Sequence, residues 1–156
     1  MSTTDDQILE ILLRDARTPH AQIAEEVGLS RPAVAERVKK LEQTGVIYGY
    51  STVLNHETFG RSIMAFISAK QSSPLSQGVS RALLKLADEP DILEIHSIAG
   101  EDCFLIKVRT SDMRSLNEIL TNLKKPPLQM TTKTTIVLET YFEKVAGKTL
   151  RPEIRK

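Results

Sequence analysis

Cysteine is nearly absent from this sequence, because Cys103 is the one example in 156 residues. An intramolecular disulfide is therefore excluded, and a reducing compartment is the simpler assumption. Tryptophan is missing and aromatic residues make up 4% of the chain, which argues against a stacking platform for RNA or single strands. The apolar runs fall far short of a membrane span, and the first residues lack the basic and apolar regions of a signal peptide. These absences predict a cytoplasmic protein.

An excess of charge of one sign is also missing. Lys and Arg total 21 against 20 Asp and Glu, and the formal net charge is +1. Over the whole chain, this balance gives no argument for a nucleic-acid or membrane partner. It hides a difference, however: residues 1–55 carry six basic and eight acidic side chains, whereas residues 56–156 carry fifteen and twelve. The two parts differ electrostatically, within a length that fits one domain or two small ones.

The first part has the apolar spacing of helices. One helix is predicted to begin at Asp5, because acidic residues in the first turn suit a helix N-terminus. A second is predicted with Thr18 as its N-cap and Pro19 as its first residue. Ser30 predicts the N-cap of a third helix, which Gly45 ends. Three short helices with a tight turn before the third have the outline of a helix-turn-helix. The expected buried stripes are Ile8, Ile11 and Leu12; Ile23, Ala24 and Val27; and Val34, Val38 and Leu41.

From residue 47 onward the spacing changes mostly to the period of two that strands show. After a linking strand over 47–54, the predicted order is βαββαβ, the arrangement of ferredoxin-like domains. The fold class is therefore predicted to be α+β, with an N-terminal winged-type helix-turn-helix domain followed by a ferredoxin-like βαββαβ domain. The later strands are expected over 61–71, 92–98, 104–110 and 132–142, and the helices over 75–88 and 113–123.

The first part is either a DNA-binding module or a plain helical bundle, and the charges of the third helix are the evidence that bears on this choice. Residues 30–44 carry four cations against two acids, inside a unit that is acidic as a whole. Cations along a helix suit DNA phosphates, although solvation alone also requires a charged outer face. For DNA binding, we assign Ser30 as the cap; Pro32, Ala33 and Glu36 as the residues nearest the groove; and Arg31, Arg37, Lys39 and Lys40 as contacts to phosphates or bases.

Five features follow one another in residues 5–54: Asp5, Asp15-Ala16-Arg17, Gly28-Leu29-Ser30, the run ERVKKLE at 36–42 and the exit GVIYGY at 45–50. In this order they resemble the N-terminal domain of the Lrp/AsnC family of transcription regulators, the feast/famine regulatory proteins. Residues 95–108 and 134–138 are similar to the regulatory, RAM-type domain of the same family. The resemblance implies a sequence-specific DNA-binding regulator whose C-terminal domain senses an amino acid or a similar small metabolite.

The resemblance also places an effector site on the turn Ala99, Gly100, Glu101 and Asp102. Glycine lets a backbone approach a ligand closely, and the two carboxylates are acceptors for an amino group. The same residues also favour a plain hairpin turn, and many family members carry an acid where Cys103 stands. An assembly module without an effector therefore stays open as an alternative. Cys103 itself is expected to be a small buried residue.

We divide the chain into a helix-turn-helix domain (1–50), a linker strand (51–60), a ligand-sensing and dimerisation domain (61–143) and a basic tail (144–156). Helices on one side of four strands would leave an apolar sheet face, which a second copy would cover in a symmetric homodimer. Such a dimer would read a palindromic operator with half-sites about 34 Å apart. The resemblance implies larger assemblies, tetramers or octamers.

The other alternative is an enzyme on the same architecture, as in relatives that decarboxylate modified haems. The histidines are scattered and no nucleophile–base pair is visible, so we expect no enzyme, cofactor or metal site. His96 is expected to be a half-buried structural residue on its strand.

Overall fold

The computed structural model describes residues 3–71, 77–145 and 148–150. The chain divides into two compact units, one formed by residues 1–53 and 140–156 and the other by residues 54–139. Each unit has its own hydrophobic core, so each is described by itself.

The first unit begins with three helices, α1 (Thr3–Arg14), α2 (His20–Val27) and α3 (Arg31–Gln43). Gly28 ends α2 in the left-handed conformation, with φ 68°, and its N–H donates to the Ala24 carbonyl. The predicted cap of α2 is wrong by one residue, because the helix begins at His20 and the Thr18 hydroxyl donates to the Asp15 carbonyl instead. The buried stripes of the helices meet in one cluster, formed by Ile8, Ile11, Ile23, Ala24, Val34 and Val38.

The linker is irregular. The sequence predicts a strand over 47–54 and a linker strand over 51–60, but residues 44–62 contain turns and no strand. A strand needs a neighbour to accept and donate its backbone hydrogen bonds, and no described segment pairs with this one. The alternating hydrophobicity of this segment therefore does not correspond to a sheet. For the same reason α3 is not followed directly by the paired strands of a wing.

The second unit is a four-stranded antiparallel sheet in the order β2-β3-β1-β4. This order confirms the predicted α+β, ferredoxin-like class. Its elements are β1 (Ile63–Gln71), α4 (Gln77–Lys85), the 3-10 helix η1 (Leu86–Asp88), β2 (Ile92–Ser97), β3 (Phe104–Thr110), α5 (Met113–Lys124) and β4 (Met130–Ile136).

The last part of the chain differs from the prediction. The last strand of the sheet ends at Ile136 rather than at residue 142. A short hairpin follows, in which β5 (Glu143–Val145) pairs with β6 (Lys148–Leu150), so part of the predicted basic tail is paired backbone. Leu75, expected at the start of the fourth helix, and residues 151–156 lie outside the described residues.

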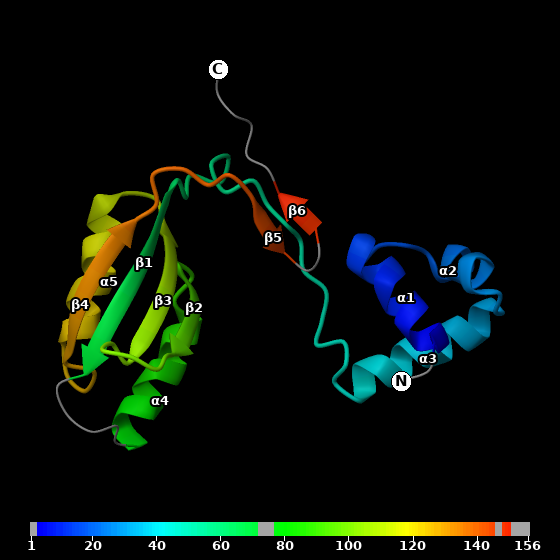
Figure 1. The fold of residues 1–156 in the computed structure, drawn as a ribbon, viewed down its shortest axis with the longest axis horizontal. Helices are drawn as coiled ribbons and strands as arrows, with labels where there is room; N and C mark the ends of the chain where they lie inside the picture. The colour runs from blue at the N-terminus through cyan, green and yellow to red at the C-terminus, as the bar shows by residue number, and fades with distance from the viewer. Residues whose placement is uncertain (1–2, 72–76, 146–147, 151–156) are drawn as a thin grey trace. The chain divides into compact units, whose positions relative to one another are not determined.

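Helices α4 and α5 cover one face of the sheet (Figure 1). The strand residues that point toward them alternate with residues on the opposite face, as strand geometry requires. The core between sheet and helices includes Ala65, Ile67, Phe104, Ile106, Val108, Leu116 and Leu123.

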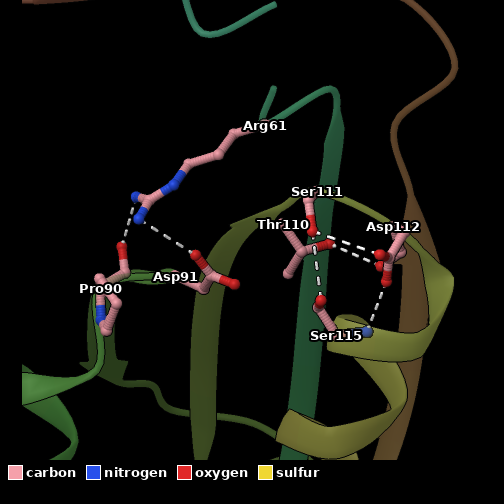
Figure 2. A network of polar contacts seen from close by, with 7 residues as sticks. All are labelled: Arg61, Pro90, Asp91, Thr110, Ser111, Asp112 and Ser115. Atoms are coloured by element: carbon pink, nitrogen blue, oxygen red, sulfur yellow. Dashed lines mark hydrogen bonds and ion pairs between the residues drawn. The ribbon is translucent and has the colours of Figure 1, made fainter. Parts of the chain in front are cut away.

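Polar contacts hold one end of this unit (Figure 2). The Arg61 guanidinium donates to the Pro90 carbonyl at 2.8 Å and lies 3.4 Å from the Asp91 carboxylate. Asp112 caps α5 by accepting the Ser115 N–H at 2.8 Å, and this hydrogen bond is the largest of the causes that lower the pKa of Asp112. The loop before β1 and the start of α5 are therefore both fixed to the sheet unit.

Candidate DNA interface and effector turn

The third helix is held at both ends. Ser30 is the N-cap with extended backbone, and its hydroxyl oxygen accepts the Ala33 N–H at 3.4 Å. Pro32 lies in the first turn, where a missing N–H costs nothing. Thr44 closes the other end, where its hydroxyl donates to the Lys40 carbonyl at 2.8 Å. The predicted cap of α3 and its buried stripe Val34, Val38 and Leu41 are confirmed.

The residues assigned to DNA contact lie on or directly before one helix, but they differ in exposure and in ion pairing. Among the described residues, the cations Arg31, Lys39 and Lys40 form no ion pair. Arg37 is partly buried and differs from these three. The exposed members of the predicted set are Ser30, Arg31, Pro32, Glu36, Lys39 and Lys40, and the partly buried ones are Ala33 and Arg37.

Arg37 is bound to the first turn of α1. Its Nη1 donates to the Asp5 Oδ1 at 2.8 Å, and the exposed fractions of the two side chains are 39% and 19%. The sequence predicts a DNA contact for Arg37 but gives no sign of this partner. The two residues are 32 positions apart, so only the packing of α1 against α3 brings them together.

The segment after α3 exposes aromatic side chains. The Tyr50 hydroxyl donates to the Glu42 Oε1 at 2.9 Å, which ties the exit segment back to the helix. Burial raises the pKa of Tyr50, and the Glu42 carboxylate raises it further. Tyr48 is 99% exposed. Sequence analysis gives neither tyrosine a role beyond the family pattern.

The predicted effector turn joins β2 to β3. The Ile98 N–H donates to the Cys103 carbonyl at 3.0 Å and closes the turn, and the Cys103 N–H donates to the Ala69 carbonyl at 3.0 Å and ties the turn to β1. Gly100 has φ 145°, which other residues rarely adopt. Ala99, Gly100 and Glu101 are exposed, whereas Asp102 is partly buried. Cys103 is partly buried and packs against the core.

The sheet face opposite the helices is mixed rather than apolar. Phe66 of β1 and Leu105 of β3 lie on it, but Lys107 and Arg109 follow Leu105 on the same side of β3, and Lys107 is paired with Phe66. The Arg109 Nη2 donates to the Met64 sulfur at 3.3 Å. The prediction of a plain apolar face is therefore wrong, because the residues between the buried positions of β3 include two cations.

An ionic cluster lies at the edge of this same face. On β2, Glu94 is 3.2 Å from His96 and 3.5 Å from Lys107. The hydrogen bond with His96 is the largest cause that lowers the pKa of Glu94, and Lys107 acts in the same direction. His96 is exposed, not half-buried as expected, because β2 is an edge strand.

In the described ranges, no three or more His, Cys, Asp or Glu side chains are placed to hold a metal ion. The helices in these ranges are also too short or too polar to cross a membrane.

These features define a class: a helix-turn-helix module with a separate ferredoxin-like α+β unit. The family model for the AsnC-type helix-turn-helix domain matches residues 1–42, and that for the Lrp/AsnC ligand-binding domain matches residues 64–146. The chain belongs to the Lrp/AsnC family of helix-turn-helix transcriptional regulators. This confirms the resemblance seen in the sequence.

Individual relatives can be aligned with this chain over about nine tenths of its length. The HTH-type transcriptional regulator FL11 of Pyrococcus abyssi is 32% identical, covering 89% of this chain and 90% of its own. The regulator LrpA of Mycobacterium tuberculosis is also 32% identical, over 91% and 95%. A feast or famine regulatory protein from M. tuberculosis, solved with L-methionine, is 30% identical, with a TM-score of 0.80 over 90% of this chain and 95% of that one.

Proposed function

We propose that this regulator binds a specific double-stranded operator by placing α3 in the major groove. The observation that carries this proposal is the capped helix whose cations Arg31, Lys39 and Lys40 are exposed and without ion pairs in the described part of the chain. Phosphates would bind these cations, while Pro32, Ala33 and Glu36 lie on the turns nearest the bases. Ser30 caps the helix, and Arg37, whose guanidinium is bound to Asp5, is not among the proposed phosphate contacts.

The test is DNA binding as a function of salt concentration. A duplex selected by the wild-type protein from a randomised pool is compared with a scrambled duplex. The variant Lys39→Ala/Lys40→Ala should bind the selected duplex more weakly, and its plot of log K against log salt should flatten by about 0.9 for each phosphate that the variant no longer neutralises. Lys85→Ala, which removes an exposed cation of α4, is the control for net charge.

Unchanged affinity and salt dependence in the double variant would contradict the assignment. The charge balance of the chain adds a second readout. Because the net charge is +1, non-specific attraction to DNA is weak, and the selected duplex should bind much more tightly than the scrambled one. A ratio near one would contradict sequence-specific binding.

For the ligand-binding unit, we propose that the turn formed by Ala99, Gly100, Glu101 and Asp102 contacts an amino acid or a similar small metabolite. Three features of the turn support this: its hydrogen bond to β1, the space around the Cα of Gly100 and the two acidic side chains. The relative that was solved with L-methionine also supports it. The alternative is a unit that only assembles subunits. Titration calorimetry with the twenty amino acids separates the two, because an assembly unit would give no heat of binding.

We also propose a symmetric homodimer that covers the open sheet face, with further assembly to tetramers or octamers. The apolar side chains of that face, Phe66 and Leu105, support this arrangement, and a two-fold dimer would match a palindromic operator. The proposal includes no catalytic activity, because the family models and the named relatives are those of transcriptional regulators. It places the protein in the cytoplasm with its DNA.

A further inference from the structure

The contact between Arg37 and Asp5 joins the helix that we assign to DNA recognition to the first turn of α1. Asp5 lies one turn before the buried Ile8, and Arg37 lies beside the buried Val38. Both partners therefore stand at the rim of the helical core, on the two elements whose mutual angle fixes how α3 is presented. The contact thus joins these two elements directly.

The pair is also more enclosed than the ion pair that joins α1 to α2. Asp5 is 19% exposed and Arg37 39%, whereas Arg14 and Glu26, which join α1 to α2, are 72% and 40% exposed with a separation of 3.4 Å. Exposed pairs contribute little because water screens them and both side chains lose freedom. Partial burial and a 2.8 Å charge-assisted hydrogen bond make the contact of Arg37 stronger and more directional.

A cavity of about 200 Å³ lies at this contact. Its lining includes Asp5 and Arg37 together with Lys40, Leu41, Thr44 and Val46. The pocket is partly open to solvent, so the contact between Asp5 and Arg37 borders a surface hollow beside the end of α3.

We propose that Arg37 is a positioning residue, which acts through Asp5 to set the orientation of α3, and not a cation that contacts phosphate. This inference rests on the proposed DNA-binding role of α3. Asp5 already occupies one end of the guanidinium, while Lys40, which lines the same cavity and forms no ion pair among the described residues, stays available for phosphate. The two cations thus have different roles on one helix.

The test compares Asp5→Asn with Asp6→Asn. Both variants remove one negative charge from the first turn of α1, but only the first weakens the contact with Arg37. Below the melting temperature of each variant, Asp5→Asn should bind the selected duplex about tenfold more weakly, equivalent to about 1.4 kcal/mol. Its affinity for the scrambled duplex and its salt slope should stay as in wild type. Asp6→Asn should leave the ratio of the two affinities unchanged.

The opposite result is equally measurable. If Arg37 were a phosphate contact restrained by Asp5, then Asp5→Asn would free it, and binding would become tighter with a steeper salt slope. Either that result or an unchanged affinity ratio in the folded variant would overturn the proposal. A loss of stability alone would lower the melting temperature without changing the ratio, and it would also overturn the proposal.

A second variant keeps the test independent of the folding of Asp5→Asn. Arg37→Lys retains a cation for phosphate but loses the planar guanidinium, so the positioning role predicts the same loss of discrimination as Asp5→Asn. A phosphate role predicts wild-type behaviour for Arg37→Lys. Failure of the wild-type protein to select any duplex would instead contradict the proposed function, and this outcome is distinct from selection that Asp5→Asn leaves unchanged.

Discussion

A single carboxylate caps the N-terminus of α5, and the charge of this side chain, Asp112, contributes to stability. Asp112 Oδ1 accepts the Ser115 N–H, and the lowered pKa of Asp112 records that the folded state prefers the charged form. A group whose pKa is lowered on folding stabilises the protein above its unfolded pKa, and this contribution is lost as pH falls through the folded pKa.

The variant Asp112→Asn tests this linkage. Asparagine keeps an acceptor at the cap but has no charge, so wild type should be more stable at neutral pH because its carboxylate faces the positive end of α5. The difference should be constant above about pH 4, the ordinary value for aspartate, and should shrink below it. Thermal unfolding from pH 7 to pH 2.5 measures it, with Glu89→Gln, whose side chain is exposed, as the control. A difference that grows toward low pH would contradict the linkage.

Residues differ in how well the sequence predicts them. The cap at Ser30 is predictable because its partner is three residues away and the signal is local. Thr18 carries the same local signal, yet its hydroxyl donates to a competing acceptor, the Asp15 carbonyl, and the helix begins later. The partner of Arg37 is not predictable, because no local pattern encodes a contact 32 residues distant.

At the scale of elements, the strands of the sheet are predictable where one buried face gives a continuous alternation of buried and less buried residues. The prediction for β3 is correct to the residue, since its buried alternation is continuous from Phe104 to Thr110. The linker has the same alternation without a partner strand, and it is not a strand. The open face differs from the expected apolar face because the alternation that buries one side of β3 leaves Lys107 and Arg109 on the other side.

The proposed dimer can be tested on that open face. Phe66→Glu would place a charge among Leu105 and Lys107, where a second copy is proposed to pack. Losing a buried Phe costs about 1.5–3 kcal/mol, and a two-fold interface contains it twice. The dimer should therefore dissociate at least about 100-fold more readily in sedimentation experiments. Leu84→Glu is the control, because Leu84 is an exposed apolar residue of α4, on the helix side. If Leu84→Glu dissociates the protein and Phe66→Glu does not, the interface lies on the helix side.

At the scale of the whole molecule, the near-zero net charge is the sum of an acidic first part and a basic second part. Residues 1–55 are acidic, and four of their six cations lie on α3, while residues 56–156 are mildly basic. The family membership explains this division, because one unit is of the helix-turn-helix type and the other of the ligand-binding type. A ligand that binds only the folded protein must stabilise the unit that holds it.

This stabilisation gives the last prediction. An effector at 100 times its dissociation constant should raise the free energy of unfolding by about 2.7 kcal/mol, and thermal unfolding in the presence of each amino acid would show it. Asp102→Asn should abolish the shift if this partly buried carboxylate accepts the amino group, and Gly100→Ala should weaken it by straining a backbone with φ 145°. Asp88→Asn, an exposed acid after α4, is the matched control. A shift that survives Asp102→Asn unchanged would place the ligand elsewhere, and no shift with any amino acid would favour a unit that only assembles subunits.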